Sequence, residues 1–214
     1  MPKIIGIYGL AANPPTLGHT HVIKSVLDAN IVDEIWVVPT YVHFHGKNMV
    51  PYEIRCEMCD RAFLKDAKFP KDIVKVMRIE NAIATLEPDY DGSTTSMLEN
   101  LRKHQNHDYR IIIGQDNADS MHSWKNGNNL IANEKFIVLP RSRKLPVNRD
   151  AGWYEYPPHM FLETIEMLDI SSTMVRERCK HAHDALKLTY EMSDCISAYV
   201  MYLILENNLY RGDK

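Results

Sequence analysis

The stretch that decides the fold reads Lys3-Ile4-Ile5-Gly6-Ile7-Tyr8-Gly9 and continues as Leu10-Ala11-Ala12-Asn13-Pro14-Pro15-Thr16-Leu17-Gly18-His19. Its first half is rich in Ile, which is typical of a short buried strand. A turn of small residues and prolines follows. A helical pattern then opens at Thr16 or Leu17, and its apolar face is formed by Val22, Ile23, Val26 and Leu27. The chain therefore begins with a strand, a tight loop and a helix.

The start of that helix is a candidate anion site. Backbone N–H groups in the first turn of a helix lack partners within the helix, so they are free to bind phosphate. His19 falls in or near this first turn. A cationic imidazole there would oppose the helix dipole unless an anion lay beside it. The same pattern also fits an ordinary first βα unit with a solvated His19, and the local features alone leave both interpretations open.

Apolar runs alternate with helical patterns along the rest of the chain. Further strands are expected at residues 34–38, 74–79, 109–113 and 135–139, and within 160–168. Further helices are expected at residues 51–65, 94–104, 116–124, 171–181 and 194–207. Residues 80–91 and 141–159 are expected to be irregular. This alternation predicts an α/β fold, with a Rossmann-like, mostly parallel sheet covered by helices on both faces. We expect one domain over residues 1–214, with a C-terminal helical part from about residue 171 to 214.

Composition limits the function classes. The chain has 214 residues, 45% of them hydrophobic, and a formal net charge of -3. This charge gives no overall attraction to nucleic acid or to a membrane surface, although a local basic site is compatible with it. No apolar run approaches the ~20 residues that span a bilayer. We therefore expect neither nucleic acid nor membrane as a partner.

The compartment follows from the N-terminus and the cysteines. Met1-Pro2-Lys3 leads directly into a strand, so we expect no signal peptide. The four cysteines are scattered and too few for a disulfide scaffold. A cytoplasmic location is expected. The oligomeric state stays open, and a homo-oligomer is one of its outcomes.

A second candidate site lies in Asp169-Ile170-Ser171-Ser172-Thr173-Met174-Val175-Arg176-Glu177-Arg178. Three consecutive hydroxyl residues open an apparent helix and provide capping groups. Arg176 and Arg178 follow within two turns, where the helix dipole disfavours cations. A polyphosphate bound there would turn this cost into a gain. The alternative is a capped surface helix with two solvated arginines.

A third candidate site is Gly114-Gln115-Asp116-Asn117, directly after the most apolar strand, with Trp124 nearby in sequence. A carboxylate at the carboxyl end of a strand is well placed to bind a ribose hydroxyl, and Trp124 could stack on a planar ring. The alternative is a helix-capping Asp and a half-buried Trp. The chain has no Gly-x-Gly-x-x-Gly motif, no Walker motif and no Gly-x-Ser-x-Gly motif.

Cys56-x-x-Cys59 and three His-x-His pairs invite a metal interpretation. The two cysteines lie on an apparent helix beside apolar residues, where small buried cysteines are common. A structural zinc site needs four ligands, usually from paired motifs, and Cys179 and Cys195 form no such pair. We therefore predict no metal-binding residues.

Thr16-Leu17-Gly18-His19 and Ile170 to Arg176 together resemble the signatures of a nucleotidyltransferase superfamily, Thr/His-x-Gly-His and Ile-Ser-Ser-Thr-x-x-Arg. Within that superfamily the chain looks most like nicotinate or nicotinamide mononucleotide adenylyltransferases, over nearly its whole length. This narrower resemblance also rests on Gly114 to Asn117 with Trp124, His45-Gly46-Lys47, Arg55-x-x-Met58, Thr94, Phe136 to Arg141, and Asn208-Leu209-Tyr210.

The chain departs from the family in its first loop. Members usually have Gly-Gly-Ser/Thr-Phe-Asp/Asn-Pro, whereas here Leu10 replaces a Gly and Ala11 replaces a hydroxyl residue. Leu tolerates positive φ poorly, so we expect an altered loop geometry. Other interpretations are a different superfamily member, such as a phosphopantetheine adenylyltransferase or a cytidylyltransferase, or a non-catalytic nucleotide-binding homologue.

The resemblance implies an in-line attack of a mononucleotide phosphate on the α-phosphorus of ATP, with pyrophosphate released and Mg²⁺ bridging the phosphates. It implies His19, Thr16 and Arg176 as catalytic residues. It implies ATP-binding residues Gly9, Leu10, Ala11, Gly18, His19, Gly114, Asp116, Ile170, Ser171, Ser172, Thr173 and Arg176. It implies mononucleotide-binding residues Asn13, Lys47, Arg55, Thr94, Trp124 and Arg141. The choice between nicotinate and nicotinamide stays open.

Overall fold

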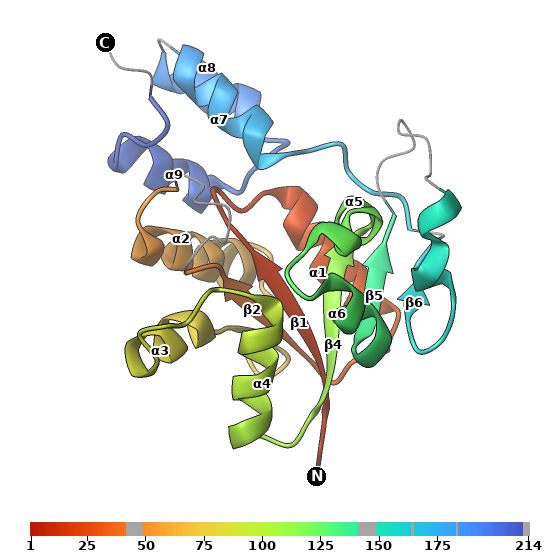
Figure 1. Ribbon diagram of the computed structural model, residues 1–214. Coiled ribbons are helices and arrows are strands. Elements are labelled where there is room, and N and C mark those ends of the chain that lie inside the picture. Colours follow the sequence, from red (N-terminus) through yellow and green to blue (C-terminus); the bar gives the residue numbers. More distant parts are fainter. Residues whose placement is uncertain (42–48, 141–148, 164, 183, 212–214) are drawn as a thin grey trace.

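A computed structural model describes residues 1–41, 49–140, 149–163, 165–182 and 184–211. Within them the strands form one six-stranded sheet in the order β3-β2-β1-β4-β5-β6, and every neighbouring pair is parallel (Figure 1). The strands are β1 Ile4–Leu10, β2 Glu34–Pro39, β3 Val74–Val76, β4 Asp108–Gly114, β5 Lys135–Leu139 and β6 Met160–Phe161. The predicted fold class is confirmed.

The Ile-rich opening run became the central strand because both of its faces are buried. Ile5 and Ile7 of β1 face one hydrophobic cluster, whereas Tyr8 and Leu10 face the other. Successive side chains of a strand point to opposite faces, so a strand covered on both sides needs apolar residues at nearly every position.

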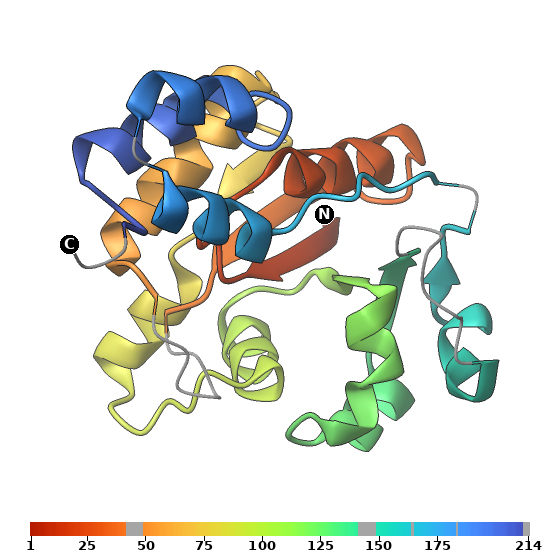
Figure 2. The same ribbon diagram turned by 90° about the horizontal axis from the view of Figure 1, so that it is seen from above.

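Helices cover both faces of the sheet, as Figure 2 shows from above. One face carries α1 Leu17–Asp28, α2 Tyr52–Cys59, a π-helix at Asp60–Asp66, α7 Ser172–His181, α8 Ala185–Met192 and α9 Ala198–Glu206. The other carries α3 Ile79–Leu86, α4 Thr94–His104, α5 Gln115–Asp119 and α6 Gly127–Asn133, with 3₁₀ segments at Met121–Ser123 and Arg149–Glu155. No described helix is both long enough and apolar enough to cross a membrane.

Several expected elements differ from those observed. Residues 80–91 were expected to be irregular, but α3 occupies most of them, since Ile79 and Ile83 lie four apart on one face and Ile83 is buried. The strand expected over residues 74–79 ends at Val76, and the helix expected over 51–65 changes to a π-helix after Cys59. Helices α6 and α8 were not predicted.

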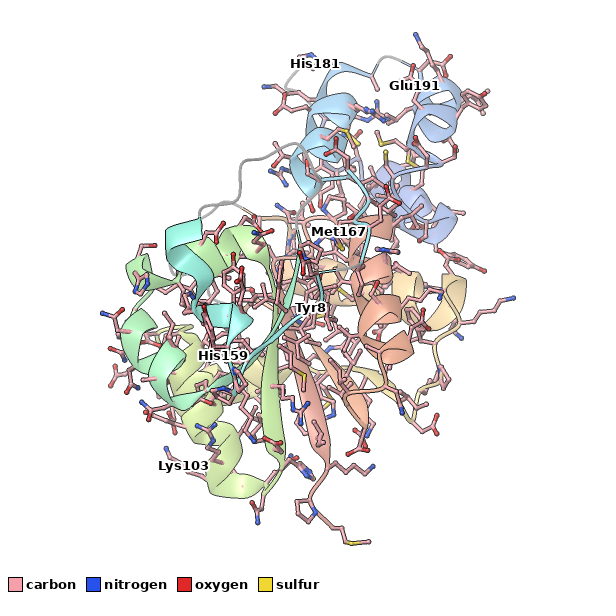
Figure 3. The ribbon with its side chains drawn as sticks, turned by 90° about the vertical axis from the view of Figure 1, so that its right-hand side faces the viewer. Tyr8, Lys103, His159, Met167, His181 and Glu191 are labelled. Atoms are coloured by element: carbon pink, nitrogen blue, oxygen red, sulfur yellow. The ribbon has the colours of Figure 1, made fainter. Side chains whose placement is uncertain are left out.

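All carboxyl ends of the strands meet at one edge of the sheet, because every pair is parallel. Chain connections from that edge lead into α1 and α5, and α7 also begins there. The N-terminus of the chain lies at the opposite edge (Figure 1). Figure 3 places Tyr8 within the sheet, whereas His181 and Glu191 mark α7 and α8, which extend beyond its carboxyl edge.

Candidate active site

The first turn of α1 is organised around His19. Thr16 is the N-cap residue and is only 2% exposed. Its backbone N–H donates to Nδ1 of His19 at 2.9 Å, and its Oγ1 lies 2.8 Å from the same nitrogen. Because Nδ1 accepts a hydrogen bond, the neutral ring carries its proton on Nε2, which makes Nε2–H the donor available to a ligand.

The His19 imidazole is neutral, so it does not oppose the helix dipole. The side chain is half-buried, and its desolvation lowers the pKa to about 4. The imidazole is therefore neutral at pH 7 in the free protein, and no cation stands at the helix N-terminus. A polyphosphate beside it would favour the protonated form and raise that pKa.

The first loop, which departs from the family pattern at Leu10 and Ala11, has its left-handed residue at Ala12. This residue ends β1 as extended strand and is 7% exposed within the core. The positive φ of the loop falls instead on Ala12, at 50°, two residues further on. The loop thus places left-handed backbone on a small side chain, and Leu10 has no positive φ.

The second signature caps α7 and lies against the first. The Ser171 hydroxyl accepts the Met174 N–H at 3.2 Å, which confirms the predicted cap. A Cβ added to Gly18 would lie 3.4 Å from the Ile170 carbonyl oxygen and 3.3 Å from Thr16 Oγ1. Glycine therefore allows the N-terminal turns of α1 and α7 to approach closely, as two motifs 150 residues apart in sequence must if they serve one site.

Side chains of α7 hold the first loop directly. The Ser172 hydroxyl donates to the Pro14 carbonyl at 2.8 Å. Arg176 donates through Nη1 to the Asn13 carbonyl at 2.8 Å and through Nη2 to Thr173 Oγ1 at 3.0 Å. Figure 2 shows α7 beside the N-terminal loop. We refer to the joined N-terminal turns of α1 and α7, with His19 and Arg176, as the phosphate clamp.

The two arginines of α7 have different environments. Arg176 is half-buried and has no carboxylate partner among the residues that the structure describes, so its charge faces neutral acceptors. Arg178 donates to the Glu191 carbonyl at 3.0 Å and lies 3.4 Å from Cys195 Sγ, which ties α7 to the segment that follows it. Only Arg176 belongs to the clamp.

A cleft of about 290 Å³ opens at the same edge of the sheet, at the carboxyl ends of β1 and β4. It brings together Gly9, Thr94 and Trp124, three predicted site residues from distant parts of the sequence. A Cβ added to Gly9 would have no atom within 4 Å, so the cleft is open above this glycine. Other polar lining residues are Thr40, Glu80, Ser93, Asn117 and Lys125.

Two elements of the cleft were missed from the sequence. Glu80 is 7% exposed and accepts the Tyr41 N–H at 2.8 Å. Asp91 pairs with Lys125, which lines the cleft. Burial alone would raise the pKa of Asp91, but hydrogen bonds from Lys125 and Ser93 lower it to about 2. The apolar spacing of α3 could have revealed Glu80, whereas no sequence pattern indicates the Asp91–Lys125 pair.

Asp116 lies at the carboxyl end of β4, as predicted. A Cβ added to Gly114 would stand 2.7 Å from Asp116 Oδ1, so the glycine makes room for this carboxylate. The Asp116 side chain is exposed in the first turn of α5. Its role toward a ribose stays a prediction.

Arg55 has a different environment from the one expected. It is 2% exposed and donates to three backbone carbonyls: Val50 at 2.9 Å, Ala11 at 2.8 Å and Thr40 at 2.7 Å. These contacts hold the first loop against the chain after β2, and direct contact with a mononucleotide phosphate stays a prediction. Lys47 and Arg141 lie outside the described residues.

The residues that the structure describes contain no group of three or more His, Cys, Asp or Glu side chains that could hold a metal ion. The four cysteines are free and buried.

The strand order and the helix N-termini at the carboxyl edge define a nucleotide-binding α/β protein. The chain belongs to the cytidylyltransferase-like family, which matches residues 7–178.

Relatives narrow this class further. The chain is 28% identical over 212 residues to the nicotinate-nucleotide adenylyltransferase of Bacillus subtilis strain 168, covering 98% of this chain and 100% of that protein. It is 28% identical over 207 residues to a probable nicotinate-nucleotide adenylyltransferase of Myxococcus xanthus, covering 96% and 94%. The fold matches Plasmodium falciparum nicotinic acid mononucleotide adenylyltransferase, solved with APC and with NaAD, at a TM-score of 0.78, 21% identity and 97% coverage of both chains.

Proposed function

We propose that this protein transfers AMP from ATP to nicotinate mononucleotide, forming the dinucleotide and releasing pyrophosphate in NAD biosynthesis. The names of its relatives support the reaction. The observation that carries the proposal is the phosphate clamp. The N-terminal turns of α1 and α7 lie close together at the carboxyl edge of the sheet. They carry a neutral His19 that offers Nε2–H and an Arg176 without a carboxylate partner among the described residues. Each of these groups favours an anion.

The chemistry needs no protein nucleophile. The mononucleotide phosphate attacks the α-phosphorus in line, and the protein supplies position and charge. His19 donates from Nε2 to oxygens of the α-phosphate, and Arg176 holds the phosphates that leave as pyrophosphate. Since Thr16 is buried and contacts His19 Nδ1, we assign Thr16 the role of orienting the imidazole.

Mg²⁺ accompanies ATP in this proposal. The clamp offers N–H and guanidinium donors, which bind phosphate and repel a cation. Mg²⁺ keeps several waters and prefers phosphate oxygens to a protein cage, so the described donor set fits a metal that arrives with the nucleotide. Bound there, it would neutralise charge on the phosphates.

The cleft receives the pyridine mononucleotide. Trp124 is half-buried, which leaves part of its ring surface able to stack on the pyridine. Ser93 and Thr94 form the N-terminus of α4, an eleven-residue helix, and both residues line the cleft. A carboxylate gains more from a helix N-terminus than a neutral amide does, which favours nicotinate. Asp116 holds the ribose of ATP.

The test is a turnover assay with ATP and Mg²⁺ plus one acceptor at a time: nicotinate mononucleotide, nicotinamide mononucleotide or phosphopantetheine. Pyrophosphate release and the coupled product are both measured. We expect dinucleotide with nicotinate mononucleotide, at a higher kcat/KM than with nicotinamide mononucleotide. Preference for phosphopantetheine would move the chain to another branch of the family. ATP binding without product from any acceptor would indicate a nucleotide-binding protein without this activity.

A further inference from the structure

The side chain of Asn13 joins three distant parts of the chain. Its Oδ1 accepts hydrogen bonds from the Tyr210 hydroxyl at 2.9 Å and from the Val50 N–H at 3.3 Å. Its backbone carbonyl accepts the bond from Arg176. Asn13 is 3% exposed, so these bonds form in a region with little competing water. The C-terminal tail therefore reaches the residue that holds the clamp arginine.

The tail is shaped to make this contact. After α9, Asn208 and Tyr210 have φ of 49° and 59°, in the left-handed region that non-glycine residues rarely adopt. These two turns direct the Tyr210 ring back onto the core cluster that α7, α8 and α9 share. Arg211 then donates to the Ala182 carbonyl at 2.9 Å, which fixes the tail beyond the tyrosine.

The direction of the Tyr210–Asn13 bond is fixed. The Val50 N–H donates to Asn13 Oδ1, so this end of the amide is an oxygen and can only accept. The Tyr210 hydroxyl, whose pKa is raised by burial, is protonated and donates to the same oxygen.

We propose that Tyr210 is a positioning residue for the phosphate clamp: its hydroxyl orients Asn13, and the Asn13 carbonyl in turn holds the Arg176 guanidinium toward the leaving phosphates. Arg176 has two neutral acceptors among its described contacts, and Asn13 provides one of them. Loss of the tyrosine hydroxyl would leave the buried amide oxygen with one donor and loosen the turn on which Arg176 depends. This inference rests on the proposed function for its phosphates and goes beyond it in assigning Tyr210.

The test compares Tyr210→Phe with the control Tyr202→Phe. Tyr202 lies on α9 and is 57% exposed. Its hydroxyl donates to Glu206 at 2.7 Å, so its hydrogen bond stays within the same helix. Binding of a non-hydrolysable ATP analogue with Mg²⁺ is measured by calorimetry. We expect Kd to rise about fivefold in Tyr210→Phe, the effect of one neutral hydrogen bond, and to stay unchanged in Tyr202→Phe. An unchanged Kd in both variants would overturn the proposal.

A double-mutant cycle separates positioning from general packing. Tyr210→Phe is combined with Arg176→Ala, and the proposal predicts that the tyrosine substitution costs no further affinity once Arg176 is absent. Equal losses in both backgrounds would show that Tyr210 acts independently of Arg176. If Tyr210→Phe fails to fold, Asn13→Ala removes the acceptor from the other side, and the same cycle is run with it.

The binding readout keeps this inference distinct from the proposed function. Wild-type protein that binds the analogue but forms no dinucleotide would remove the function, and the cycle would still decide the role of Tyr210. Wild-type protein that forms dinucleotide, with additive losses in the cycle, would keep the function and remove the positioning role.

Discussion

The two edges of the sheet treat charge in opposite ways. At the amino edge, Glu34 is 3% exposed, and its carboxylate accepts hydrogen bonds from Lys3, from Lys75 at 2.6 Å and from the Trp36 indole N–H at 2.9 Å. Burial alone would raise the pKa of Glu34, but these three donors lower it to about 2. The negative charge of Glu34 is therefore neutralised by donors from the protein itself.

At the carboxyl edge, the described contacts of Arg176 include no anionic partner. Arg176 donates only to neutral oxygens among its described contacts, and burial lowers the pKa of His19, so its imidazole is neutral. Two helix N-termini add their dipoles to the same place. This edge is complementary to a polyanion that the chain does not itself contain, so the difference separates groups that stabilise the fold from groups that bind a ligand.

The largest effect is expected from His19→Ala at the carboxyl edge. The variant loses the Nε2–H donor to the α-phosphate, and we expect kcat to fall about 10²- to 10³-fold, the usual cost of one transition-state donor. The melting temperature should stay close to that of the wild type. The matched control is His104→Ala, since His104 is an exposed histidine in the last turn of α4. Near-normal turnover in His19→Ala would remove the catalytic assignment.

Arg176→Ala should have the next largest effect. Loss of charged hydrogen bonds to phosphate is expected to raise the KM for ATP about 10- to 100-fold, and the KM for the mononucleotide much less. Arg178→Ala is the control on the same helix, and it should lower thermal stability without changing the KM for ATP, because Arg178 bonds to Glu191 and Cys195. Steady-state kinetics with each substrate varied in turn will measure the two KM values. Equal losses for both substrates would contradict the phosphate role of Arg176.

A smaller effect is expected from pH. The pKa of His19 is about 4 in the free protein, and a bound polyphosphate raises it, so binding takes up a proton at pH values between the two pKa values. The affinity for an ATP analogue should therefore increase as pH falls from 8 to 5, by up to about tenfold per pH unit below the pKa of the complex. The phosphates titrate in the same range, and His19→Ala corrects for this. If the affinity for the analogue changes with pH in the same way in the wild type and in His19→Ala, protonation of His19 is not linked to binding.

The smallest effect on activity is expected from Glu34→Gln. Loss of the buried charge should destabilise the fold by about 2 kcal/mol, or about 5 °C in melting temperature, while kcat/KM stays within about twofold. The folded pKa is below the ordinary value, so the Glu34 contribution is present above about pH 4.5 and is lost as pH falls toward 2. Thermal melts from pH 7 to 3 should show the two proteins converging. A large loss of kcat/KM would mean that the amino edge also serves the site.

Periodicity predicted the architecture well because the central strands are buried on both faces. The runs at β1, β2, β4 and β5 are continuous apolar stretches, and their positions follow from the sequence to within a residue or two. The short helix α3 was hidden because acidic residues obscured the spacing of Ile79 and Ile83. Helices α6 and α8 have only seven and eight residues, which is too short for a clear apolar periodicity.

The candidate site was predictable where one motif sits on one helix N-terminus. Thr16 contacts His19, and Ser171 caps α7 as expected, because capping chemistry is local. Helix position alone left Arg176 and Arg178 equivalent, and the motif resemblance selected Arg176. The structure adds that Arg176 is the one that contacts the first loop. Arg55 was predicted as a ligand, and its three bonds to carbonyls follow from tertiary contacts that no spacing encodes.

The measurement that tests the phosphate clamp most directly is a crystal structure of the protein with Mg²⁺ and a non-hydrolysable ATP analogue. We expect the triphosphate between the N-terminal turns of α1 and α7, with His19 Nε2 and the Arg176 guanidinium each about 3 Å from phosphate oxygens. The adenosine ribose should lie beside Asp116. A triphosphate bound elsewhere, or one that contacts neither His19 nor Arg176, would contradict this account of the carboxyl edge.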